Sequence, residues 1–126
     1  MQITTPLSDQ LGKYLDLSSL QLKLTAENMA NVDTPRYRAR GIDFASEMQR
    51  SLAEVFNPRE GTASTTASDP VIRDVDGLLE RPDGNNVSMD REGLNMAEAQ
   101  LRFRTGVELL RREFTRVQNA IQSDGK

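Results

Sequence analysis

The sequence contains no cysteine and no histidine, and these two absences remove most of the familiar catalytic chemistry. Without cysteine there is no disulfide and no thiolate nucleophile. Without histidine the chain lacks the commonest neutral-pH acid–base group and metal ligand. No pair of acidic residues is set apart by an apolar surround, as a carboxylate-based hydrolase would require. We therefore expect a protein that is not an enzyme and that uses no cofactor and no metal ion.

Apolar residues are also scarce. Hydrophobic residues make up 37% of the chain and aromatic residues 5%, which is less than an ordinary globular domain carries. The 126 residues suffice for one small domain. A thick core within a single chain is not expected. Such a chain instead buries its apolar stripes against partners, and the conformational entropy of ordering the chain is lost when it binds them.

The charge balance and the hydropathy exclude two further classes of protein. Sixteen basic and 19 acidic residues give a net charge of -3, which argues against a nucleic-acid partner held by its phosphates. No run approaches the roughly 18 consecutive apolar residues of a transmembrane helix. The first nine residues lack the basic start and apolar segment of a signal peptide. We expect a protein without a transmembrane segment, either cytosolic or exported without a cleaved signal peptide.

Helical spacing of apolar residues predicts a first helix over residues 6–31. Thr5 is the predicted N-cap, with Pro6 at the first helical position. A second apolar face, with Leu17, Leu20 and Leu24 on it, implies that the helix has two neighbours. Those neighbours are either partner subunits, which the scarcity of other apolar sequence favours, or elements of the same chain. The main stripe consists of Leu7, Leu11, Tyr14, Leu15, Leu22, Ala26 and Met29.

The middle of the chain shows weaker patterns. Pro35 ends the first helix, because it cannot continue the hydrogen-bonded ladder. Asp43 is the predicted N-cap of a short amphipathic helix that ends before Asn57-Pro58. The Gly, Ala, Ser and Thr residues of 59–69 predict a loop. Two short apolar runs flank Asp76-Gly77 and indicate a small β-hairpin.

A last helix is predicted to start at Asp90 as its N-cap. From Phe103 onward its apolar residues advance in steps of 4, 3, 4, 3 and 4, the spacing of a coiled-coil seam. The seam spans under three heptads and is too short to be stable alone. We expect it to pack on the first helix and on both helices of neighbouring subunits. Its members are Phe103, Val107, Leu110, Phe114, Val117 and Ile121.

Together these patterns predict a mainly α fold. The long terminal helices form an antiparallel pair resembling a coiled coil, joined by a short middle helix and an irregular loop with a small β element. Three segments follow: residues 1–38 with the first helix and bend, 39–89 with the middle helix and loop, and 90–126 with the last helix. The charged residues of 102–116 that lie off the seam are expected to form mainly a solvated face.

The turn after the first helix carries a recognisable motif. Residues 28–38 resemble the Asn-x-Ala-Asn-x-x-Thr-Pro-x-Tyr motif of the flagellar rod and hook superfamily. Residues 39–44 and 83–92 are similar to its FlgB branch. Arg36 departs from the small or amide residue that many members have. The matching residues are Asn28, Ala30, Asn31, Thr34, Pro35 and Tyr37.

This resemblance implies a proximal rod subunit of the bacterial flagellar basal body. Such a subunit is exported unfolded through the flagellar type III channel, and its terminal helices line the core of the periplasmic rod. It would form part of the drive shaft that transmits torque and encloses the export channel. The implied partners are copies of itself, other rod proteins, and an adaptor at the membrane ring or export gate. Two alternatives remain: another flagellar axial rod protein, or a small secreted helical adhesin or effector.

The resemblance also suggests roles for single residues. Phe44 and Met48 match the spacing of a flagellar export signal, although any amphipathic helix contains that spacing. Arg36, Arg38 and Arg40 alternate and either meet carboxylates or form a solvated edge. The bend itself is either an interface element or an ordinary helix end followed by a loop. The predicted assembly residues are Leu7, Leu11, Leu15, Leu22, Met29, Phe103, Val107, Leu110, Phe114, Val117 and Ile121.

Two glycines within the last helix, Gly93 and Gly106, each cost about 1 kcal/mol relative to alanine. Close approach of a second helix is the expected reason for both. Residues 83–90 distantly resemble a calcium loop, but Val87 and Ser88 stand where a third ligand and the glycine belong, so calcium binding is rejected.

Overall fold

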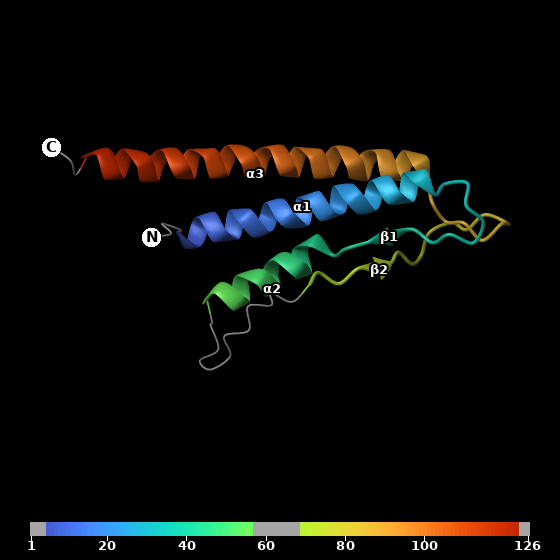
Figure 1. Ribbon diagram of the computed structural model, residues 1–126. Helices are drawn as coiled ribbons and strands as arrows, with labels where there is room; N and C mark the ends of the chain where they lie inside the picture. Colours follow the sequence, from blue (N-terminus) through green and yellow to red (C-terminus); the bar gives the residue numbers. More distant parts are fainter. Residues whose placement is uncertain (1–4, 57–68, 124–126) are drawn as a thin grey trace.

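Two long antiparallel helices dominate the fold (Figure 1). The structure is a computed structural model that describes residues 5–56 and 69–123. Its helices are α1 (Pro6–Ala30), α2 (Phe44–Phe56) and α3 (Met89–Ser123), and its short strands are β1 (Arg40–Gly41) and β2 (Arg73–Asp74). The mainly α architecture, with a short middle helix and a small β element, is the predicted one.

The start of α1 follows the prediction. Thr5 adopts an extended conformation, and its hydroxyl accepts a hydrogen bond from the Ser8 amide at 3.1 Å. The Ser8 hydroxyl accepts in return from the Thr5 amide at 3.0 Å. This reciprocal capping box satisfies two of the amides that a helix start leaves without a partner. Pro6 fits the first position because its missing N–H would have no helical partner there.

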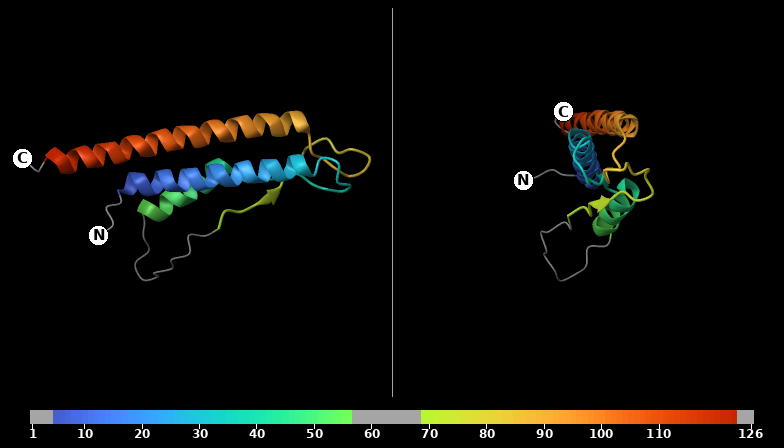
Figure 2. Two further views of the ribbon diagram at one scale, coloured as in Figure 1. Left: turned by 45° about the horizontal axis from the view of Figure 1, so that its top comes forward. Right: turned by 90° about the vertical axis from the view of Figure 1, so that its right-hand side faces the viewer.

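The second face of α1 is covered by the same chain. Leu17 and Leu24, one heptad apart, are both buried, and α1 contacts both α2 and β1. The right-hand view of Figure 2 places α2 and the strands on one side of the α1–α3 pair. The expectation that a partner subunit covers this face is therefore wrong. A 13-residue helix from the middle of the chain was enough to cover it.

Asp43 caps α2 as predicted. Its carboxylate accepts hydrogen bonds from the Ser46 hydroxyl at 2.7 Å and the Ser46 amide at 3.1 Å. These bonds, the side-chain one first, hold the pKa of Asp43 below its usual range. The predicted loop over residues 59–69 lies almost wholly outside the described residues.

The small β element differs from the predicted hairpin. β2 pairs with β1 in antiparallel register, Arg40 opposite Asp74 and Gly41 opposite Arg73, and the Asp76-Gly77 turn does not join two paired strands. Residues 71–75 find their partner in the segment that follows the α1 bend. Sequence patterns of turns report only local pairing, so this non-local pairing was not predictable from them.

The start of α3 also departs slightly from the prediction. The helix begins at Met89, so Asp90 lies in its first turn and is not the N-cap. The Glu92 amide donates to the Ser88 carbonyl at 2.9 Å, which is the first helical bond. Acidic residues in a first turn still interact favourably with the helix dipole.

The core is thin. Among the described residues the buried hydrophobic ones are Leu11, Leu17, Leu24, Ala39, Val87 and Ala99, while eleven large hydrophobic residues remain exposed. Over residues 5–56 and 69–123, no helix has both the length and the apolar content needed to cross a bilayer. A single chain therefore leaves much apolar surface for partners to cover.

Candidate assembly surface

Asn28, the first residue of the predicted motif, is the centre of the bend. Its side chain is only 2% exposed, and its amide group makes four hydrogen bonds. The Nδ2 atom donates to the Arg40 carbonyl at 2.9 Å and to the Glu92 carboxylate at 3.1 Å. The Oδ1 atom accepts from the Arg40 amide at 2.9 Å and the Tyr37 hydroxyl at 3.2 Å. One side chain thus joins α1, the returning chain and α3.

Tyr37 completes this contact. Burial, with smaller contributions from nearby acidic residues such as Glu27 and against the opposing effect of Arg40, raises the pKa of its phenol. The neutral hydroxyl is then available as the donor to Asn28. Through this bond Tyr37 ties the returning chain to α1.

The remaining motif residues shape the turn itself. Asn31 donates from Nδ2 to the Glu27 carbonyl at 2.8 Å, and its Oδ1 accepts from the Thr34 hydroxyl at 3.1 Å. Pro35 and Ala30 are exposed. This arrangement is a side-chain-bonded helix end, of the kind that Asn and Thr commonly form.

Arg36 occupies an unusual backbone conformation. Its φ angle is 60°, in the left-handed region, which few side chains other than Asn and Gly adopt readily. The Arg36 amide donates to the Asp83 carbonyl at 2.9 Å. A Cβ on Gly84, whose own φ is +81°, would lie 3.3 Å from Arg36 Cγ. The departure from the family motif therefore falls where two left-handed turns meet.

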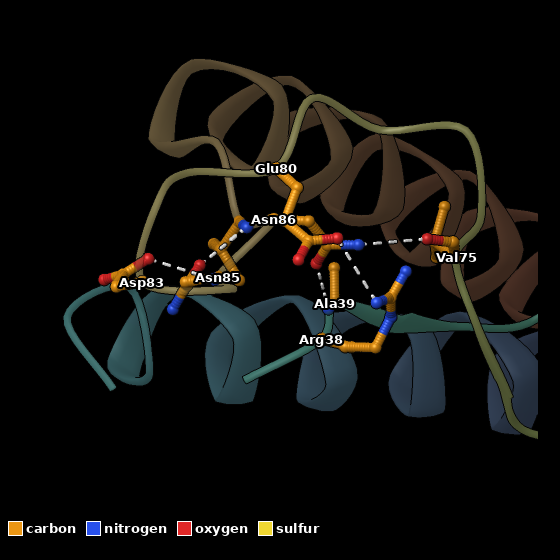
Figure 3. A network of polar contacts seen from close by, with 8 residues as sticks. Arg38, Ala39, Val75, Glu80, Asp83, Asn85 and Asn86 are labelled. Carbon is orange, nitrogen blue, oxygen red and sulfur yellow. Dashed lines mark hydrogen bonds and ion pairs between the residues drawn. The ribbon is translucent and has the colours of Figure 1, made fainter. Parts of the chain in front are cut away.

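Two adjacent asparagines that sequence reasoning missed close the bend from the other side (Figure 3). Asn85 is fully buried, and its Nδ2 donates to the carbonyls of Asn31 and Thr34 at 2.9 and 2.8 Å. Asn86 accepts from the Ala39 amide at 2.6 Å and donates to the Val75 carbonyl at 3.2 Å. The sequence signals for them were the Asp83-Gly84 step just before them and the similarity of residues 83–92 to the FlgB branch.

Two of the three alternating arginines, Arg38 and Arg40, lie near carboxylates. Arg38 pairs with Glu80 at 3.4 Å, and Arg40 approaches Glu27 at 3.9 Å. Both pairs are about half exposed, so each contributes little stability. Of the two alternatives, contact with carboxylates holds for these two arginines.

Four residues of α3 at seven-residue spacing form the column that is buried in the chain. This inner column consists of Glu92, Ala99, Gly106 and Glu113. Its ends are polar and bond to the two ends of α1. Glu92 accepts from Asn28, and Glu113 accepts from the Thr5 hydroxyl at 2.9 Å while pairing with Arg116 at 2.8 Å. These two contacts set the antiparallel register of the helix pair.

The middle of the inner column permits close approach of the helices. A Cβ on Gly106 would lie 2.8 Å from Leu15 Cδ2 and 2.9 Å from Tyr14 Cδ1. Close helix packing thus explains Gly106. It does not explain Gly93, where a Cβ would meet nothing within 4 Å, so that half of the expectation is wrong.

The predicted seam of α3 lies beside the inner column, not on it. We call Phe103, Val107, Leu110, Phe114, Val117 and Ile121 the outer seam. Of these residues, Val107, Leu110 and Val117 are half-buried, while Phe103, Phe114 and Ile121 are exposed. Phe114 is 58% and Ile121 57% exposed. The chain therefore covers the outer seam only along one edge.

The predicted stripe of α1 lies on the same side of the pair as the outer seam. Leu15 contacts the position of Gly106, and Leu22 and Met29 follow it at seven-residue spacing, half-buried. Leu7 is exposed and Leu11 is buried. Because α2 and the strands lie on the other side of the pair (Figure 2), Leu7, Leu15, Leu22, Met29 and the outer seam form an apolar strip that no other element of the described chain covers, whereas Leu11 is buried within the chain.

Phe44 and Met48, the candidate export signal, lie at the start of α2. The Phe44 ring packs edge-on against Tyr14 with ring centroids 5.3 Å apart. The Arg102 guanidinium lies 4.6 Å from the Phe44 ring centroid and donates to Gln21 at 2.8 Å. Arg102 and the buried Glu113 are thus structural, and the expectation of a solvated face does not hold for them.

A hollow of about 210 Å³ lies beside α2. It is lined by both apolar and charged residues, among them Lys13, Leu17 and Glu47. Glu47 is buried, pairs with Arg50 and accepts from the Val71 amide at 3.1 Å. Within residues 5–56 and 69–123, acidic side chains nowhere gather in a group of three that could hold a metal ion.

Comparison with known proteins reveals several relatives that share one name. The chain is 32% identical over 120 residues to the flagellar basal body rod protein FlgB of Salmonella typhimurium, covering 86% of this chain and 87% of that protein. It is 34% identical over 133 residues to the protein of that name in Cereibacter sphaeroides, covering 95% of this chain and 99% of that protein. For FlgB of Escherichia coli the identity is 31% over 121 residues, covering 86% and 88%. No protein-family model matches the chain.

Proposed function

The chain belongs to the family of flagellar basal body rod proteins named FlgB, and from this premise we propose that it polymerises through the apolar strip of its two long helices. Its function is that of a structural component of the proximal rod of the flagellar basal body. The polymer would form part of the drive shaft that transmits torque and encloses the export channel. Its contacts would be with identical copies, with other rod proteins and with an adaptor at the membrane ring or export gate.

One observation carries this proposal: the outer seam is turned away from α1 and is left largely exposed. A monomer that folded to be soluble alone would bury its heptad seam against α1, but the inner column of α3 contains two carboxylates, an alanine and a glycine. The aromatic and branched residues lie on the outer seam instead, where Phe114 and Ile121 are more than half exposed. Exposed apolar strips of this kind mark protein–protein interfaces.

The strip is tested by introducing charge into it. The double variant Leu110→Asp with Phe114→Asp should be exported but should fail to enter the rod, because each carboxylate would be desolvated in the interface. The matched control is Thr105→Asp with Asn119→Asp, which adds the same charge at exposed positions on the other side of α3. Export is measured by blotting the periplasmic fraction, and incorporation by blotting purified basal bodies. Normal incorporation of the Leu110 and Phe114 variant would overturn the assembly surface.

The structural role is tested separately by deletion of the gene. Cells without it should lack rods and motility. Normal rods in such cells would contradict the role, whatever the result for the strip.

Phe44 and Met48 remain a proposal for the export signal. In the folded chain Phe44 is half-buried between Tyr14 and Arg102, so an export gate would reach it only in the unfolded chain. Phe44→Ala should therefore lower the secreted amount, while Tyr14→Ala, which disturbs the same folded contact, should not. Equal secretion by the wild type and Phe44→Ala would refute the signal.

A further inference from the structure

Leu79 is the most exposed large hydrophobic residue of the described chain, at 93%. It lies in the segment 74–83, which we call the acidic loop because it contains three aspartates and one glutamate against a single arginine. Single exposed leucines are common and need no explanation by themselves. Leu79 differs in two respects: hydrogen bonds and an ion pair hold the loop on both sides of it, and arginines border an apolar seam elsewhere on the molecule.

The acidic loop is anchored on both sides of Leu79 (Figure 3). Before it, the Val75 amide donates to the Ala39 carbonyl at 2.8 Å, and Asn86 bonds the Val75 carbonyl at 3.2 Å. After it, Glu80 pairs with Arg38 at 3.4 Å and the Arg81 amide donates to the Asn85 carbonyl at 2.9 Å. A loop backbone held at both ends in this way loses little conformational entropy on binding.

A stretch of α3 away from the acidic loop carries the opposite charge. Residues 102–116 contain five arginines and two glutamates, a net charge of +3. The whole chain carries -3, so the rest carries -6. Arg104 and Arg111, one heptad apart and both exposed, border the solvent side of the outer seam beside Val107 and Phe114. Figure 1 shows the loops at one end of the α1–α3 pair and the C-terminus of α3 at the other.

We propose that the acidic loop of one copy docks head to tail on the outer seam of a second copy, with Leu79 inserted beside Phe114. This inference rests on the proposed polymerisation and names one of its contacts. An apolar anchor in a segment of net negative charge matches an apolar seam bordered by arginines, in both polarity and charge. Because the two patches differ and lie on separate parts of the molecule, the contact is heterologous and leaves one patch free at each end of a chain of copies, as an open polymer needs.

The same seam of a second copy is a poorer occupant. Two outer seams packed antiparallel would place Arg104 and Arg111 of one copy against the same arginines of the other, and like charges across an interface are unfavourable. The acidic loop avoids this repulsion.

Cysteine cross-linking tests the contact, because the natural chain has no cysteine to compete. Full-length Leu79→Cys protein is mixed with full-length Phe114→Cys protein and oxidised. We expect a mixed disulfide dimer, since the two Cβ atoms would come within the few ångströms that a disulfide requires. The control pairs Leu79→Cys with Ser19→Cys, an exposed site on α1, and should give severalfold less dimer. Equal dimer yields with Phe114→Cys and Ser19→Cys would overturn the proposal, as would Phe114→Cys cross-linking chiefly to itself.

A charge exchange provides an independent readout. Asp76→Lys in the loop-bearing copy and Arg111→Glu in the seam-bearing copy should each lower the dimer yield, and the two together should restore it. Dimer yields that neither substitution changes would contradict the charge pairing. If cross-linking fails while the Leu110 and Phe114 variant still cannot enter the rod, only the head-to-tail contact is wrong. If that variant enters the rod normally, the assembly strip itself is wrong.

Discussion

Asn28 illustrates how one side chain can define a bend. Its four hydrogen bonds join the backbone of Arg40, the Tyr37 hydroxyl and the Glu92 carboxylate. Replacement by alanine leaves these groups buried without partners, and each such group costs about 1–3 kcal/mol. We predict that Asn28→Ala lowers the free energy of unfolding by at least about 2 kcal/mol, measured by urea unfolding followed by circular dichroism.

The control for Asn28 is Asn95→Ala. Asn95 contacts the same Glu92 carboxylate, but only through one bond of 3.5 Å. Its removal should cost less than about 1 kcal/mol, the net worth of an ordinary hydrogen bond. Equal losses for the two variants would show that the bend does not depend on Asn28.

Asp43 makes the start of α2 sensitive to acid. Hydrogen bonds from Ser46 lower the pKa of its carboxyl group in the folded chain. The stabilisation by the ionised cap is therefore present above the pKa of the unfolded chain and is lost as the pH falls through the lowered folded pKa. We predict that the Ser46 amide NMR signal moves with a midpoint below the ordinary aspartate range. In Asp43→Asn, which keeps a good cap, this titration should vanish, and its persistence would assign it to another group.

At the scale of whole elements, the two glycines of α3 give a matched pair. Gly93→Ala should stabilise the chain by up to about 1 kcal/mol, because alanine favours the helix and a Cβ meets nothing within 4 Å. Gly106→Ala gains the same propensity but drives its Cβ into Leu15 and Tyr14, and overpacking typically costs about 1–3 kcal/mol. We expect urea midpoints that shift in opposite directions. A shift upward for both would mean that the helices can separate at Gly106 without cost.

At the scale of the whole molecule, the two long helices enclose only a small hydrophobic core. The six buried hydrophobic residues in the part of the chain that the structure describes include two alanines, so burial within one chain offsets only part of the entropy of ordering. We predict that the isolated chain unfolds at low urea concentration and gains both helicity and stability when other rod components are added. Circular dichroism with and without those components measures this gain. A chain that is fully helical and resistant to urea by itself would rule out folding coupled to assembly.

Most of the elements could be read from the sequence because their signals are local. Caps such as Thr5 and Asp43, the turn at Pro35 and the 4-3 spacing from Phe103 act on neighbouring residues. The structure has a helix after each of the two caps, a turn at Pro35 and a helix across the 4-3 spacing. The family motif likewise predicted a bend at Asn28. The scarcity of apolar residues correctly indicated that one chain cannot cover all its stripes, since the number of apolar side chains limits the area that folding can bury.

Which face meets which neighbour was decided by contacts between distant segments. The heptad spacing located a seam on α3 but could not reveal that Glu92 and Glu113, bonded to Asn28 and Thr5, turn that seam away from α1. Nor could it show that α2 covers Leu17, or that Asn85 and Asn86 close the bend. Hydrophobic periodicity identifies an apolar face without specifying its partner, because burial is non-directional. Hydrogen bonds are directional. Here the bonds of the buried polar side chains fix the rotation of α3 about its axis, and that rotation leaves the outer seam exposed.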